Sequence, residues 1–123
     1  IFGDGEQTRD YVYVGDVVEA SMTATDLTLG PVGTALDERA YNVGTGVETS
    51  VNALAEAMMA AGERELEVRH AAPRAGELRH SSLDNSKLKG VGWTPATSLD
   101  DGLRRTLEHI AEHDHMVQEG TDP

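Results

Sequence analysis

Short segments with strand character alternate with helix signals along this chain, and this alternation limits the fold more than any other feature. Residues 9–14 alternate tyrosine and valine with a period of two, which is typical of a β-strand. Residues 40–46, which end in glycines, and residues 65–70, which alternate apolar and charged side chains, are also predicted strands. Because strands and helices alternate, we expect an α/β fold with a small, mostly parallel sheet and flanking helices.

The clearest helix signal covers residues 51–61. Apolar side chains recur there at helical spacing, Ser50 is a suitable N-cap, and Gly62 is a suitable stop. This pattern predicts a helix with one face in the core. Three further helices are predicted, with these limits: Asp16 as N-cap to Gly30-Pro31, near Asp84 to Gly90, and Ser98, with Asp101 as its capping-box partner, to about Glu112.

The length of the chain fits one domain. A chain of 123 residues can bury a single hydrophobic core, and residues 1–113 are predicted to form one domain around it. Residues 114–123 carry almost no apolar side chains and are predicted to be a disordered tail. Three short strands make a sheet whose edges need cover, and the chain opens on Ile1 and Phe2 rather than on methionine. We therefore expect this domain to be part of a longer protein.

The charge of the chain limits its partners. Ten lysines and arginines against 22 acidic residues give a net charge of −12, which argues against nucleic acid as a partner. No apolar run is long enough for a membrane span or a signal peptide, so no membrane partner is expected. The chain has no cysteine, which fits a cytoplasmic protein without a thiolate metal site. We interpret His109, His113 and His115 as a solvated helix end rather than a metal site.

Three motifs, in order along the chain, carry a resemblance to a known family. They are IFGDGEQTRDYVYVGDVVEA at 1–20, YNVGTGVETSV at 41–51, and RAGELRHSSLDNSK from residue 74 with GWTPATSLDDGLRRT after it. Together they cover residues 1 to about 110 and resemble the C-terminal part of the extended short-chain dehydrogenases/reductases. Within that NAD-dependent epimerase/dehydratase family they are most similar to the UDP-glucose 4-epimerase branch. The resemblance implies the substrate-binding portion of a nucleotide-sugar 4-epimerase.

The resemblance also implies what this stretch lacks. In the family, NAD and the Ser/Thr-Tyr-Lys set belong to an N-terminal Rossmann domain, and neither a GxxGxxG turn nor a Tyr-x-x-x-Lys pair occurs here. We therefore expect no catalytic and no cofactor-binding residue in this chain, with NAD held by the N-terminal domain. Relatives commonly dimerise through that domain, which leaves a homodimer of the full-length enzyme open. The expected partners are a UDP-sugar and the Rossmann domain itself.

Seven residues match nucleotide-sugar-binding positions of the family. Arg9 and Arg74 match the two arginines that bind the diphosphate, a task suited to the planar fork of guanidinium donors. Glu77 matches the carboxylate that accepts hydrogen bonds from the ribose hydroxyls. The remaining matches are Phe2 beside the uracil, Tyr11 and Val51 in the nucleotide pocket, and Ser81 against the sugar.

Simpler interpretations of the same residues are available without the resemblance. Arg9 beside Asp10 is then most simply a surface ion pair, and Arg74 with Glu77 a structural one. The glycines of residues 42–46 suit a phosphate cradle, although a tight turn between a strand and a helix has the same pattern and is favoured. Two alternatives for the function stay open. They are the same portion of a nucleotide-sugar 4,6-dehydratase or decarboxylase, and a free-standing nucleotide-sugar-binding module without catalysis.

Overall fold

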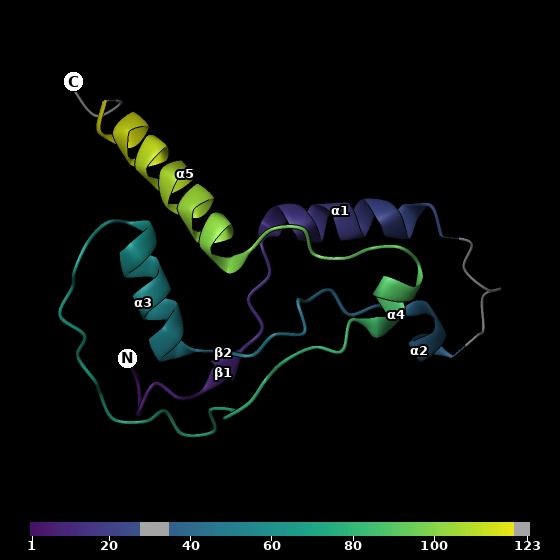
Figure 1. Cartoon of the computed structure of the whole chain (residues 1–123), viewed down its shortest axis with the longest axis horizontal. Helices are drawn as coiled ribbons and strands as arrows, with labels where there is room; N and C mark the ends of the chain where they lie inside the picture. Colours follow the sequence, from purple (N-terminus) through teal and green to yellow (C-terminus); the bar gives the residue numbers. More distant parts are fainter. Residues whose placement is uncertain (28–34, 120–123) are drawn as a thin grey trace.

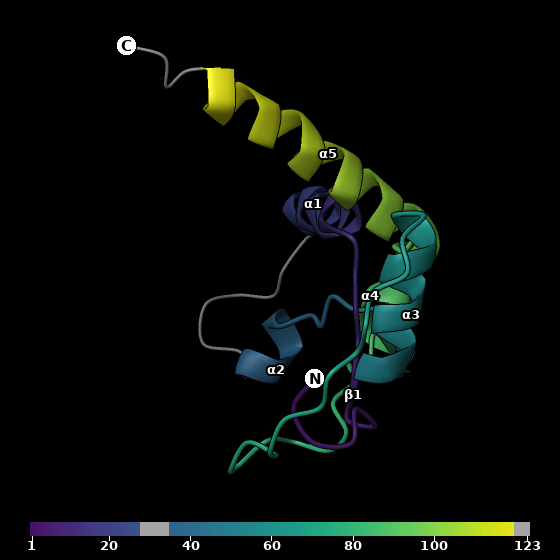
Figure 2. The same ribbon diagram turned by 90° about the vertical axis from the view of Figure 1, so that its left-hand side faces the viewer.

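The computed structural model describes residues 1–27 and 35–119. Helices flank a very small sheet, and the last helix extends away from the rest of the molecule (Figures 1 and 2). The end expected for the first helix, at Gly30-Pro31, lies outside the described residues. The elements are β1 (Thr8–Arg9), α1 (Val14–Thr25), α2 (Leu36–Arg39), β2 (Thr49–Ser50), α3 (Val51–Ala61), α4 (Ser86–Gly90) and α5 (Leu99–Glu119).

The sheet with flanking helices is present as expected, but the prediction of mostly parallel pairing is wrong. Strands β1 and β2 run antiparallel, with Thr8 opposite Ser50. A single parallel bridge joins Phe2 to Ala71. A strand needs a second extended segment beside it to exchange hydrogen bonds. Within the described ranges, residues 40–46 and 65–70 form no strand, and residues 65–70 meet the N-terminal segment at their end, where the Ile1 amino group donates to the Arg69 carbonyl at 2.7 Å. The sequence pattern identified extended segments without identifying their neighbours.

Helices α3 and α5 pack against each other. The apolar face of α3 is only partly covered, because none of its residues is buried, so the prediction that this face lies in the core is wrong for the described chain. Helix α3 is capped as expected, because the Ser50 side chain accepts a hydrogen bond from the Ala53 backbone N–H at 3.1 Å and Gly62 follows the last turn. The Asp101 N–H likewise donates to the Ser98 hydroxyl oxygen at 3.1 Å, at the start of α5. Helix α5 continues to Glu119, beyond the end predicted near Glu112.

The predicted N-cap role of Asp16 is wrong. Helix α1 begins at Val14 with Tyr13 as N-cap, so Asp16 lies inside the first turn. Its side chain is only 3% exposed and accepts hydrogen bonds from the backbone N–H of Thr97 at 3.1 Å and the Thr97 hydroxyl at 3.0 Å. The carboxylate therefore connects α1 to the segment before α5 instead of capping its own helix.

The hydrophobic core is small and lies between α1 and α4. Ala20, Leu88 and Trp93 are buried together, and Tyr41 and Val43 pack against them. Trp93 is 4% exposed and is the aromatic residue of this core. Among the described helices, each is too short or too polar to cross a lipid bilayer.

Candidate functional site

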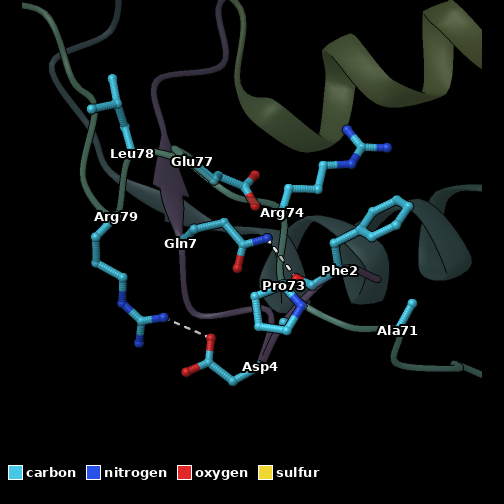
Figure 3. A pocket seen from close by; sticks show the side chains of 10 residues that line it. Phe2, Asp4, Gln7, Ala71, Pro73, Arg74, Glu77, Leu78 and Arg79 are labelled. Carbon is cyan, nitrogen blue, oxygen red and sulfur yellow. Dashed lines mark hydrogen bonds and ion pairs between the residues drawn. The ribbon is translucent and has the colours of Figure 1, made fainter.

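A groove of about 460 Å³ lies between the N-terminal turn and the loop that follows Ala71 (Figure 3). Its volume falls in the range of small-molecule sites. Charged and apolar side chains alternate around it, so it offers both stacking surface and ionic contacts. We call it the N-terminal groove, and its lining residues are Phe2, Gly3, Asp4, Gln7, Ala71, Pro73, Arg74, Glu77, Leu78 and Arg79.

Backbone hydrogen bonds place the two walls of the groove side by side. At one end, the Gly3 N–H donates to the Ala71 carbonyl at 2.9 Å and the Ala71 N–H to the Ile1 carbonyl at 2.7 Å. At the other end, the Thr8 N–H donates to the Arg79 carbonyl at 2.8 Å. The segment between Ala71 and Arg79 is thereby held along the first residues of the chain, although it forms no strand.

Arg9 forms an ion pair with Glu77, which lines this groove, although Arg9 itself is not among the lining residues. The Arg9 Nη2 lies 3.4 Å from the Glu77 Oε1, while its Nη1 donates to the backbone carbonyls of Thr8 at 2.6 Å and Leu78 at 2.8 Å. The ionic partner of Arg9 is thus Glu77. The simpler interpretations, an ion pair of Arg9 with Asp10 and one of Arg74 with Glu77, are therefore wrong. The two side chains are 31% and 28% exposed, so both still reach solvent.

The Arg74 guanidinium stacks on the aromatic ring of Phe2. The guanidinium carbon lies 3.8 Å from the ring centroid, which is the geometry of a cation–π contact (Figure 3). Among the side chains that the structure describes, no acidic partner forms an ion pair with Arg74. Its positive charge therefore faces the groove without an acidic partner there.

Sequence reasoning missed Asp4, Gln7 and Arg79. Arg79 pairs with Asp4 at 2.7 Å, and the buried Gln7 amide donates to the Phe2 carbonyl at 3.0 Å. The Arg79 side chain and the Glu6 N–H hold the pKa of Asp4 below its ordinary value. Asp4 and Arg79 stand 75 positions apart in the sequence. No local sequence pattern predicts that these two residues interact. Their contact could have been predicted only from the pairing of the two groove walls.

Three predicted site residues lie away from this groove. Tyr11 lines a separate cavity of about 330 Å³ beside the start of α5. Val51 is the first residue of α3, where its N–H donates to the Gln7 carbonyl at 3.1 Å. Ser81 is half-buried in the loop that continues from Arg79. The structure thus brings Phe2, Arg74 and Glu77 together in one groove, with Arg9 paired to Glu77, and it places the other three predicted residues outside this groove.

The glycine-containing turn at residues 44–46 holds an internal anion. The Asp10 carboxylate accepts hydrogen bonds from the Thr45 N–H at 2.8 Å, the Thr45 hydroxyl at 2.6 Å, the Gly46 N–H at 2.9 Å and the Leu83 N–H at 3.3 Å. Partial burial by itself would raise the pKa of Asp10, but these hydrogen bonds outweigh it and lower the pKa. Asp10 occupies the donors that a phosphate cradle would need, which favours the interpretation as a turn, although residues 40–46 form no strand before it.

Comparison with protein families identifies the chain. The family model described as GDP-mannose 4,6 dehydratase matches residues 1–106. The chain belongs to this family of extended short-chain dehydrogenases/reductases. Its three motifs and its groove thus fall within the stretch that the family model covers.

Individual members of the family are similar over most of the chain. The UDP-glucose 4-epimerase of Mycolicibacterium smegmatis is 45% identical over 109 residues, which are 88% of this chain and 33% of the relative. The UDP-glucose 4-epimerase of Thermotoga maritima, solved with UDP-glucose, superposes with a TM-score of 0.79 at 39% identity over 92% of this chain and 34% of that one. The enzyme of Thermus thermophilus, solved with NAD, gives a TM-score of 0.73 at 38% identity over 87% and 32%. The chain spans about a third of the length of these relatives.

Proposed function

We propose that this chain is the UDP-sugar-binding portion of an NAD-dependent nucleotide-sugar 4-epimerase of the UDP-glucose/UDP-galactose type. The observation that carries the proposal is the N-terminal groove, where Phe2, Arg74 and Glu77 line one cavity and Arg9 forms an ion pair with Glu77. The similar Thermotoga maritima structure contains UDP-glucose, which supports this class of ligand.

In this proposal the arginines bind the diphosphate. Arg74 faces the groove with its charge unpaired among the described residues, and Arg9 keeps part of its guanidinium exposed beside Glu77. A hydrogen bond to a charged group contributes about 1.5 to 3 kcal/mol, so two arginines supply a large share of the roughly 8 kcal/mol of a micromolar complex. Glu77 accepts hydrogen bonds from the ribose hydroxyls, and the Phe2 ring lies beside the base.

The remaining proposed contacts and the cofactor involve the rest of the full-length protein. Tyr11, Val51 and Ser81 lie outside the groove, and we propose that they contribute walls which the other part of the protein completes. NAD supplies the hydride chemistry at carbon 4 of the sugar when it is bound, and we assign its site to that other part. The residues of this chain hold the nucleotide in place while the sugar reacts, so their binding energy serves positioning.

An exposed apolar stripe on α1 supports a partner domain. Val14, Val18 and Met22 are spaced by four residues on one helix face and are 67%, 57% and 63% exposed. Helices of isolated globular domains normally turn such a face toward a core. We propose that the dinucleotide-binding part of the full-length protein covers this stripe.

Product analysis with the full-length protein tests the proposed reaction. We expect purified enzyme with NAD to convert UDP-glucose into UDP-galactose, detected by proton NMR of the sugar. A 4-keto-6-deoxy product would contradict the epimerase and favour the 4,6-dehydratase, an alternative supported by the description of the matching family model. Release of carbon dioxide from UDP-glucuronate would favour a decarboxylase. If this chain binds UDP but the full-length protein converts none of these nucleotide sugars, a free-standing binding module would be favoured.

A further inference from the structure

An ion pair between Asp4 and Arg79 forms one border of the N-terminal groove. Neither the family motifs nor the proposed function gives this pair a role. The Arg79 Nη1 donates to the Asp4 Oδ1 at 2.7 Å across the groove, and both side chains line it. Figure 3 shows this pair at the edge of the groove away from the stacked Phe2 and Arg74. The pair therefore adds an ionic contact between the two walls at the end where the Thr8 N–H donates to the Arg79 carbonyl.

Asp4 belongs to a well-supported wall. Its carboxylate also accepts the Glu6 N–H at 3.0 Å, and its carbonyl accepts a hydrogen bond from the Asn52 side-chain amide at 2.9 Å. The Asn52 N–H donates to the Gly5 carbonyl at 3.0 Å. Gly5 has a φ of +75°, and a Cβ there would lie 1.9 Å from the Asn52 side-chain oxygen, so the turn fits closely against the start of α3.

Arg79 belongs to a wall with little packing. Every residue from 71 to 80 is exposed, so no buried side chain anchors this segment. Polar contacts hold it instead: the Thr8 N–H donates to the Arg79 carbonyl, and the Arg9 guanidinium contacts Glu77 and the Leu78 carbonyl. The position of this wall therefore depends on its ionic contacts to the N-terminal segment.

We propose that Asp4 and Arg79 are positioning residues that hold the loop 73–78 against the N-terminal turn, so that Arg74 and Glu77 face a bound nucleotide. This inference rests on the proposed function. Because Asp4 neutralises Arg79, the anionic part of the nucleotide binds at Arg74 rather than at Arg79. Neither member of the pair contacts the nucleotide itself.

A charge-swap series in the 123-residue chain tests this inference. Asp4→Arg and Arg79→Asp each place like charges opposite one another, and the double variant restores the pair in reversed order. Calorimetric titration with UDP at low salt should show affinity weakened about fivefold in each single variant and restored to within about twofold in the double variant. If Arg79 bound phosphate directly, the double variant would stay as weak as Arg79→Asp, and the inference would be overturned.

Amide hydrogen exchange tests the pair without nucleotide. The Thr8 N–H, which donates to the Arg79 carbonyl, should exchange faster in each single variant and return to the wild-type rate in the double variant. Arg69→Asp is the matched control, because it breaks an exposed ion pair with Glu67 outside the groove. The control should change neither Thr8 exchange nor UDP affinity.

The two readouts separate failure of the inference from failure of the proposed function. Unchanged Thr8 exchange in both single variants, with folding verified by circular dichroism, would overturn the positioning role. Suppose that Thr8 exchange changes across the variants as expected but the wild-type chain binds no UDP. This result would support the link between the two walls, and it would reject both the role of the pair in nucleotide binding and the proposed function.

Discussion

At the residue scale, Asp10 has the most structural consequence. One carboxylate accepts four hydrogen bonds from two segments that are distant in sequence, the turn at Thr45 and Gly46 and the loop at Leu83. It lies next to Arg9, the last residue of β1, so adjacent positions supply an internal anion and a cation of the candidate site. A Cβ at Gly44 would lie 2.6 Å from the Asp10 Oδ2, which explains why the turn needs glycine there.

Asp10→Asn is expected to destabilise the chain by about 2 kcal/mol at neutral pH, because hydrogen bonds to a charged acceptor are among the stronger ones. The hydrogen bonds lower the folded-state pKa of Asp10 below its ordinary value of 3.8. Its stabilisation is therefore present above 3.8 and is lost as the pH falls through the folded-state pKa. Urea unfolding should show a wild-type advantage that shrinks in acid. A constant advantage down to the lowest pH at which the chain folds would contradict this account, and Asp26→Asn is the exposed control.

Residue motifs predicted part of the site and missed the rest for a physical reason. The motif matches named Phe2, Arg74 and Glu77, which line one groove in the structure. Asp4 and Arg79 belong to the same groove but interact across 75 positions of sequence. Local patterns contain no information about such a pair until the two segments are known to lie side by side.

At the element scale, helices were predicted well and strands poorly. Helix hydrogen bonds and caps are local, so the Ser50 cap and the apolar stripe were enough to define α3. Strand hydrogen bonds need a neighbour, and residues 65–70 have the alternation of a strand but form none in the described part of the chain, where they meet the N-terminal segment at Arg69. Asp16 lies in a helix, but its role was also mispredicted, because its hydrogen-bond partner Thr97 is 81 positions away in the sequence.

Ser50→Ala is expected to destabilise the chain by about 1 kcal/mol, because the N–H of Ala53 loses its side-chain acceptor. Ser50→Thr keeps a hydroxyl at this position and should retain most of the stability. Thermal unfolding followed by far-ultraviolet circular dichroism, which reports on helix content, measures both variants. Equal melting temperatures for wild type and Ser50→Ala would show that the cap contributes nothing to α3.

At the scale of the whole molecule, the small core and the apolar stripe on α1 have one explanation. Three buried apolar residues form the core of the described chain, while Val14, Val18 and Met22 stay exposed. The chain also spans about a third of the length of its relatives. We therefore expect much of its stability in the full-length protein to come from burial of this stripe.

Val18→Gln is expected to leave the isolated chain nearly unchanged, within about 0.5 kcal/mol, because this side chain is exposed there. In the full-length protein the same change should lower stability by about 1.5 to 3 kcal/mol, the value for burying a valine-sized side chain. Glu19→Gln, on the neighbouring exposed position, is the control in both backgrounds. Equal behaviour of Val18→Gln in the isolated chain and the full-length protein would argue against a partner on α1.

The central claim is that the N-terminal groove binds the nucleotide of a UDP-sugar, and a calorimetric titration of the chain with UDP tests it most directly. The account predicts saturable binding that Arg74→Ala weakens by about tenfold or more, as expected for loss of a charge-assisted hydrogen bond. Arg69→Ala, outside the groove, should bind UDP as the wild type does. A folded wild-type chain that binds no UDP, or an Arg74→Ala variant with undiminished affinity, would contradict the account.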